Sequence, residues 1–135
     1  MSAATTNDDL APPKKWELWT GRVFTALPSL MLLFSGAMKL SHAPPVIEGF
    51  EKFGFKESVI TPLGILEILV VVIYLIPRTA VIGAILMAAY LGGAVVTHLR
   101  VGEPFVAPAL LGVLAWGGLF LRDPRVRALV PLRRP

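Results

Sequence analysis

The chain lacks cysteine altogether, and this absence removes several chemistries at once. Disulfide bonds, thiol nucleophiles and thiolate metal ligands are all excluded. Histidine is almost as scarce, because the 135 residues include only two. We expect no metal site, since a bound metal ion needs several nitrogen, sulfur or acidic ligands together. No motif combining basic and aromatic residues for nucleic-acid binding occurs, so a nucleic-acid partner is not expected either.

Charge is also scarce: 16% of the residues are charged and 55% are hydrophobic. Four apolar runs follow one another, and each has 17 to 21 residues. Apolar runs of about 17–25 residues are long enough to cross a bilayer as helices. The sequence therefore predicts an all-α integral membrane bundle of four transmembrane helices, up-down-up-down. The predicted helices are residues 23–40, 60–76, 79–99 and 105–121.

The longest connection between these runs, residues 44–58, has its own hydrophobic pattern. Val46, Ile47, Phe50 and Phe53 recur at helical spacing, with charged residues between them. This pattern predicts a short amphipathic helix at the membrane interface. A lid folded over the end of the bundle is the alternative interpretation.

The ends of the chain are polar or basic. We expect residues 1–15 to be a disordered polar tail, residues 16–124 to form the transmembrane domain, and residues 125–135 to be a basic cytoplasmic tail. Trp16 and Trp19 lie among charges, as is typical of an interfacial anchor. We expect the first apolar run to be a retained helix and not a cleaved signal peptide, because Pro44 directly follows the small-x-small site Ser41-His42-Ala43.

Basic residues are divided unevenly between the two sides of such a bundle. The side with both termini carries nine of them, and the opposite side carries four. Because cytoplasmic segments are enriched in lysine and arginine, both termini are predicted to be cytoplasmic. The nine are Lys14, Lys15, Arg22, Arg78, Arg122, Arg125, Arg127, Arg133 and Arg134.

A single carboxylate, Glu67, interrupts the apolar run at 60–76. A carboxylate near the centre of a spanning helix costs roughly 2.5–3.5 kcal/mol on insertion scales, so such a residue is a candidate functional site by default. The alternative is a structural anchor that pairs with a basic residue on a neighbouring helix.

The directions of the helices predict which side chains meet Glu67. Side chains tilt toward the N-terminus of their helix, so Lys39 and Glu67 lean toward each other. Ser35 shares the face of Lys39. Tyr90 lies on the inward face of the third predicted helix, and His98 lies near the outer end of the same helix. We therefore predict a ligand-binding or buried polar cluster in the outer half of the bundle. Lys39 extending to the headgroups, His98 at the interface and Tyr90 in ordinary packing are the alternatives.

Small residues recur at four-residue spacing on the third predicted helix. Ala84, Ala88 and Gly92 would allow another backbone to approach closely. Internal packing and a homodimer interface are both compatible with this pattern.

Several short motifs resemble those of the DoxX-like family, and the resemblance covers residues 16–135. It implies a small multi-pass protein of the bacterial cytoplasmic (inner) membrane. Some relatives are linked to redox or oxidative-stress complexes, and the family takes its name from an association with thiosulfate:quinone oxidoreduction. No catalytic residue set is available to carry over. The motifs are residues 34–40 (FSGAMKL), 63–68 (LGILEI), 74–80 (YLIPRTA), 90–94 (YLGGA), 97–98 (TH) and 121–125 (LRDPR).

Three functions follow as hypotheses, and we do not expect the chain to be an enzyme on its own. The first is a non-catalytic accessory subunit that binds a quinone or another lipophile for a membrane redox or stress-related system. The second is a structural or assembly factor for a partner membrane protein. The third is a small proton-coupled transporter that uses Glu67, although one four-helix unit offers no inverted repeat.

Overall fold

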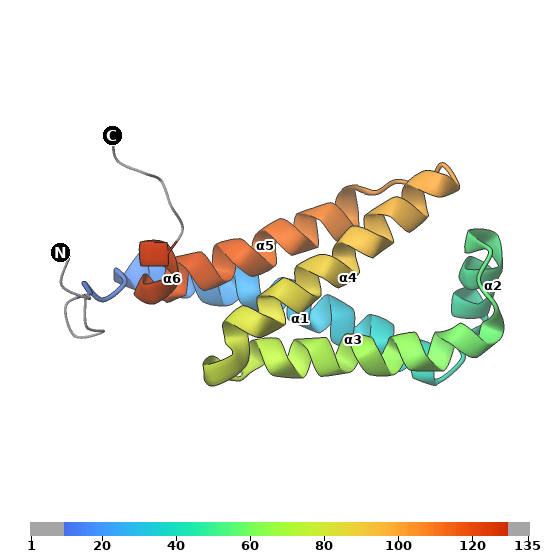
Figure 1. Cartoon of the computed structure of the whole chain (residues 1–135), viewed down its shortest axis with the longest axis horizontal. Coiled ribbons are helices and arrows are strands. Elements are labelled where there is room, and N and C mark those ends of the chain that lie inside the picture. Colours follow the sequence, from blue (N-terminus) through green and yellow to red (C-terminus); the bar gives the residue numbers. More distant parts are fainter. Residues whose placement is uncertain (1–9, 130–135) are drawn as a thin grey trace.

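The computed structural model describes residues 10–129 and contains no β-strand within them, so the predicted all-α class is confirmed. The predicted tails lie mostly outside the described residues (Figure 1). Two short 3₁₀ segments, Glu57–Val59 and Pro77–Thr79, precede α3 and α4. The α-helices are α1 (Lys15–Leu40), α2 (Pro44–Phe53), α3 (Ile60–Leu75), α4 (Ala80–Arg100), α5 (Val106–Arg122) and α6 (Pro124–Leu129).

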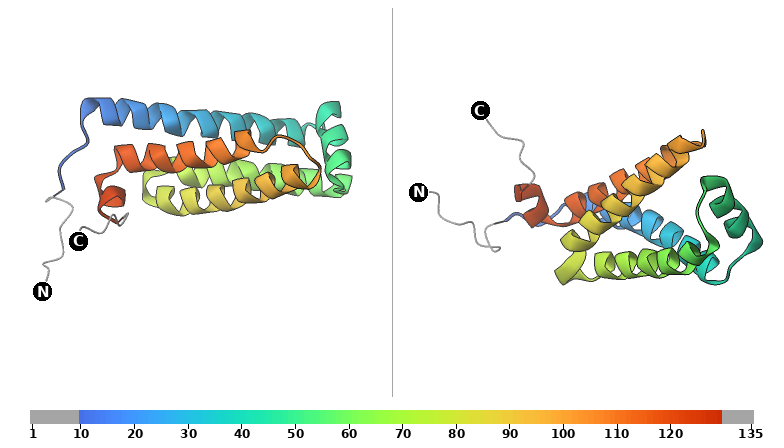
Figure 2. Two further views of the ribbon diagram at one scale, coloured as in Figure 1. Left: turned by 90° about the horizontal axis from the view of Figure 1, so that it is seen from above. Right: turned by 45° about the vertical axis from the view of Figure 1, so that its right-hand side comes forward.

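Four helices pack side by side in a ring. Helix α1 contacts α3 and α5, and α4 contacts the same two helices from the other side (Figures 1 and 2). Helices α1, α3 and α4 are long and apolar enough to cross a membrane, the last two counted with the 3₁₀ turns that precede them. Helix α5 is a shorter apolar helix of 17 residues.

Helix α1 begins at Lys15, eight residues before the predicted span at 23–40. The Lys14 backbone N–H donates a hydrogen bond to the Glu17 carboxylate at 2.8 Å. A carboxylate in the first turn also complements the positive end of the helix dipole. Trp16 and Trp19 are both exposed on this added segment. The sequence prediction began the helix late because it followed hydrophobicity and gave no weight to the cap.

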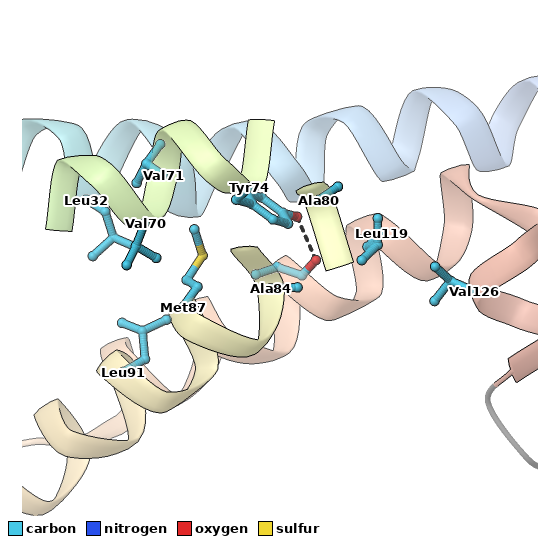
Figure 3. Close-up of a cluster of buried hydrophobic side chains, with 11 residues drawn as sticks. Leu32, Val70, Val71, Tyr74, Ala80, Ala84, Met87, Leu91, Leu119 and Val126 are labelled. Carbon is cyan, nitrogen blue, oxygen red and sulfur yellow. Dashed lines mark hydrogen bonds between the residues drawn. The ribbon is translucent and has the colours of Figure 1, made fainter. Parts of the chain in front are cut away.

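Glycines let the backbones approach closely at the α6 end of the ring. A side-chain carbon at Gly21 of α1 would lie 2.9 Å from the carbonyl oxygen of Gly118 on α5. A side-chain carbon at Gly83 of α4 would overlap the backbone of Tyr74 on α3. The buried Tyr74 hydroxyl donates a hydrogen bond to the carbonyl oxygen of Ala115 at 2.6 Å (Figure 3). This end is therefore closed by backbone contacts and one buried hydrogen bond.

The opposite end of the ring is more open. Helices α4 and α5 diverge from α1 and α3 toward the end that α2 crosses (Figures 1 and 2). A side-chain carbon added at Gly92 or Gly93 of α4 would meet nothing within 4 Å. The divergence leaves room between the helices, and the candidate site lies there.

Helix α6 occupies part of the segment predicted as a basic tail, residues 125–135. Pro124 opens the helix, and the Asp123 carboxylate accepts a hydrogen bond from the Arg125 backbone N–H at 2.9 Å. Val126 is buried, and the Arg127 guanidinium contacts the Glu17 carboxylate of α1 at 3.0 Å. Residues 124–129 therefore pack against the folded domain.

Candidate functional site

A cavity of about 550 Å³ lies at the α2 end, and α1, α2, α3, α4 and α5 all contribute to its wall. Most of the lining side chains are apolar. The structure brings all five residues of the predicted polar cluster to this cavity. They are Ser35, Lys39, Glu67, Tyr90 and His98.

Lys39 and Glu67 form a buried ion pair between α1 and α3. The Lys39 Nζ atom lies 2.8 Å from Glu67 Oε2 and donates a second hydrogen bond to Ser35 Oγ at 2.6 Å. The exposed fractions of the two charged side chains are 11% for Lys39 and 3% for Glu67. A buried charge pair must compensate for lost hydration through close geometry and further hydrogen bonds, and this pair has both.

The two backbones approach closely beside this pair. A side-chain carbon at Gly64 would lie 2.9 Å from Lys39 Cβ, and one at Gly36 would lie 3.2 Å from the carbonyl oxygen of Gly64. Glycine at both positions therefore lets α1 and α3 pack closely enough for the Lys39 ammonium to contact the Glu67 carboxylate. The motif at 63–68 thus contains both the buried carboxylate, Glu67, and the glycine that lets α1 approach it, Gly64.

Three polar groups of the cluster line the cavity close to one another. The Tyr90 hydroxyl lies near the Glu67 carboxylate, and both side chains line the cavity. The Lys39 ammonium has three donors and uses two of them. The cavity therefore presents a carboxylate oxygen, a hydroxyl and an ammonium hydrogen to whatever fills it.

His98 lies at the cavity wall apart from the ion pair. Its Nδ1 atom donates a hydrogen bond to the carbonyl oxygen of Ala94 at 2.6 Å, which leaves Nε2 as the free nitrogen. The ring packs against Phe53 of α2, with the ring centroids 5.0 Å apart. His98 therefore contacts α2 and offers one further acceptor at the rim.

The phenylalanines of the α2 segment complete the cavity, and the sequence analysis did not include them in the site. Phe50, Phe53 and Phe55 all line it, and Phe50 is buried. The Lys39 Nζ atom lies 6.0 Å from the centroid of the Phe50 ring. Gly54 ends α2 with a φ of 80°, a conformation that glycine adopts without strain, and the chain turns so that Phe55 also reaches the cavity. The helical spacing of hydrophobic residues at 46–53 was the sequence feature that could have indicated their place in the site.

A polar contact ties α2 to the loop between α4 and α5. Lys52 of α2 donates a hydrogen bond to the Glu103 carboxylate. This hydrogen bond and the charge of Lys52 hold the pKa of Glu103 below its ordinary value of 4.5. A depressed folded-state pKa means that the contact stabilises the fold above the ordinary carboxyl range and is lost as the pH falls through the lowered value. At neutral pH, α2 is held over the cavity by this contact and by Phe53 on His98.

The comparisons with known proteins give one family. Neither a curated protein nor a solved structure matches this chain. Residues 23–118 match the model of the DoxX-like family, and that segment contains the whole ion pair, Tyr90 and His98. The long apolar helices agree with a transmembrane protein. The chain therefore belongs to the DoxX-like family of membrane proteins.

Proposed function

We propose that α1, α3, α4 and α5 all span the membrane as a four-helix, up-down-up-down bundle. At about 1.5 Å per residue, the 17 residues of α5 reach about 26 Å, close to the roughly 30 Å hydrocarbon core. Its only ionisable residue is Arg122, at its last position. The bundle lies in a bacterial cytoplasmic membrane with both termini inside, which the nine-to-four division of basic residues supports.

The cavity at the α2 end is the binding site for a lipophilic molecule with a polar head. Its volume lies within the roughly 300–1,000 Å³ that small-molecule sites occupy, and its wall combines apolar side chains with a few polar groups. The observation that carries this proposal is the buried Lys39–Glu67 pair, which opens into an apolar cavity covered by α2. Ion pairs inside a membrane are expensive and mark binding or transport sites.

A quinone matches the hydrogen-bonding groups of the cavity. A quinone carbonyl accepts a hydrogen bond from the Lys39 ammonium or the Tyr90 hydroxyl, and the reduced form donates one to the Glu67 carboxylate. The phenylalanines of the α2 segment supply flat apolar surfaces for the ring. The protein then acts as a non-catalytic accessory subunit that holds a lipophile for a membrane redox or stress-related system.

Two adjacent glycines provide a matched test of this proposal. A side-chain carbon at either Gly92 or Gly93 meets open space, but Gly93 lines the cavity and Gly92 lines a different groove. We expect Gly93→Leu to fill the cavity and lower the bound lipophile at least tenfold, while Gly92→Leu leaves it unchanged. The measurement is mass spectrometry of small molecules extracted from protein that is drawn from its native membrane into nanodiscs.

The controls distinguish a specifically bound ligand from lipid that any nanodisc contains. Empty nanodiscs drawn from the same membrane supply the background. If no molecule is enriched over this background in the wild type, or if both leucine variants lose it equally, the proposed site is wrong.

A second candidate function is assembly with a partner membrane subunit. A groove of about 650 Å³ between α4 and α5 is lined by apolar residues, including Ala88, Gly92 and Gly112. Ala84, the first residue of the small-residue stripe, is buried inside the ring, so the stripe offers only Ala88 and Gly92 to a partner or a second copy. In the nanodisc experiment, a protein subunit or second copy lost from Gly92→Leu and retained by Gly93→Leu would favour this function.

A further inference from the structure

A second polar cavity, of about 470 Å³, lies at the α6 end, opposite the site described above. The wall comes from α1, the turn between α3 and α4, and the junction of α5 with α6. Three guanidinium groups, those of Arg22, Arg122 and Arg125, line it together with one carboxylate, that of Asp123. The cavity therefore has an excess of positive charge.

Arg122 is the unusual member of this group. Its Nε and Nη2 atoms are buried and have no hydrogen-bond acceptor. Its guanidinium carbon lies 5.7 Å from the centroid of the Tyr74 ring, and no carboxylate of residues 10–129 pairs with it. Leaving buried donors of a charged group without an acceptor is costly, so such groups are rare in folded proteins.

The neighbouring arginines show what Arg122 lacks. Arg125 pairs with Asp123 at 3.1 Å, and Arg127 pairs with Glu17 at 3.0 Å. Because Asp123 is already engaged by Arg125, the cavity holds no free carboxylate for Arg122 or Arg22 among the residues that the structure describes. Arg122 and Arg22 thus line this cavity without a carboxylate partner among the described residues.

We propose that this cavity binds a phosphate group, with Arg122 as its principal ligand and Arg22 at its rim. The planar guanidinium matches the geometry of phosphate oxygens, which accept paired N–H donors. Trp16 and Trp19 are exposed on the same end of α1, as expected at headgroup depth. The phosphate belongs either to an anionic phospholipid or to a soluble phosphate-bearing molecule. This site is independent of the cavity covered by α2.

Thermal unfolding in nanodiscs tests the site. The probes are phosphatidylglycerol mixed into phosphatidylcholine discs, and inorganic phosphate added to discs of phosphatidylcholine alone. We expect one or both to raise the midpoint of wild-type unfolding by about 5 °C or more. Arg122→Gln should abolish the rise. Arg122→Lys keeps the positive charge but lacks the paired N–H donors of the planar guanidinium, so it should reduce the rise. Arg78→Gln should keep the full rise, because Arg78 is exposed at the same end but does not line the cavity.

The two sources give different results. A rise with phosphatidylglycerol alone assigns the site to a lipid headgroup, and a rise with inorganic phosphate assigns it to a soluble phosphate group. The proposal is overturned if neither probe acts, if Arg122→Gln responds as the wild type does, or if that variant is markedly less stable without phosphate. Asp8 and Asp9 precede Leu10, which lines the cavity. These two residues supply carboxylates that could take the place of a phosphate group. If the variant Asp8→Asn/Asp9→Asn responds to phosphate and the wild type does not, the proposal is also overturned.

Discussion

Replacing Glu67 with glutamine is expected to lower the free energy of unfolding by about 3–5 kcal/mol, because the Lys39 ammonium then stays buried without its counter-charge. Reversible unfolding in mixed detergent micelles measures this change. Glu48→Gln is the control, since Glu48 is an exposed acid on α2, and it should change stability by less than about 0.5 kcal/mol.

The double variant Lys39→Met/Glu67→Leu separates the charge from the packing. Removing both partners of a buried ion pair in favour of apolar residues is often neutral or stabilising, so we expect stability within about 1 kcal/mol of the wild type. A Glu67→Gln variant as stable as the wild type would mean that the pair contributes nothing to the fold. A double variant as unstable as the single one would mean that packing, and not charge, was lost.

Replacing Gly83 with alanine is expected to cost about 1–3 kcal/mol, because the added carbon meets the backbone of Tyr74, which cannot move aside as a flexible side chain would. The displaced helix would also strain the hydrogen bond from Tyr74 to Ala115. Gly92→Ala on the same helix is the matched control. Its new carbon meets nothing within 4 Å, and alanine favours a helix over glycine by roughly 0.5–1 kcal/mol, so this variant should equal or exceed the wild type.

The same unfolding measurement compares the two alanine variants. Equal stabilities for Gly83→Ala and Gly92→Ala would contradict the close contact between α3 and α4. That contact is part of what closes the α6 end of the ring.

The ion pair could be predicted from the sequence because helix geometry is regular. The rise per residue sets the depth of Lys39 and Glu67, and the tilt of side chains toward the N-terminus sets their direction. Both quantities are local, so they hold without knowledge of packing. Helix geometry alone does not separate Gly93, which lines the cavity, from its neighbour Gly92, which lines the outer groove.

The features that sequence reasoning missed depend on long-range packing. Val126 and Arg127 belong to a basic segment whose composition is that of a cytoplasmic tail, and only the burial of Val126 and the contact of Arg127 with Glu17 of α1 bring them into the fold. The role of Phe50 as part of the cavity wall depends on α2 crossing the open end. The opening itself comes from the divergence of α4 and α5 from α1 and α3 (Figure 1).

The most direct test of the proposed binding site is the quantity of lipophile retained by Lys39→Met/Glu67→Leu in nanodiscs drawn from the native membrane. This variant is expected to keep the fold, so any loss reports on binding and not on unfolding. We predict that the molecule enriched with the wild type falls to the level of empty discs in the double variant. Retention at the wild-type ratio, in a variant of wild-type stability, would contradict the claim that the buried pair serves a ligand.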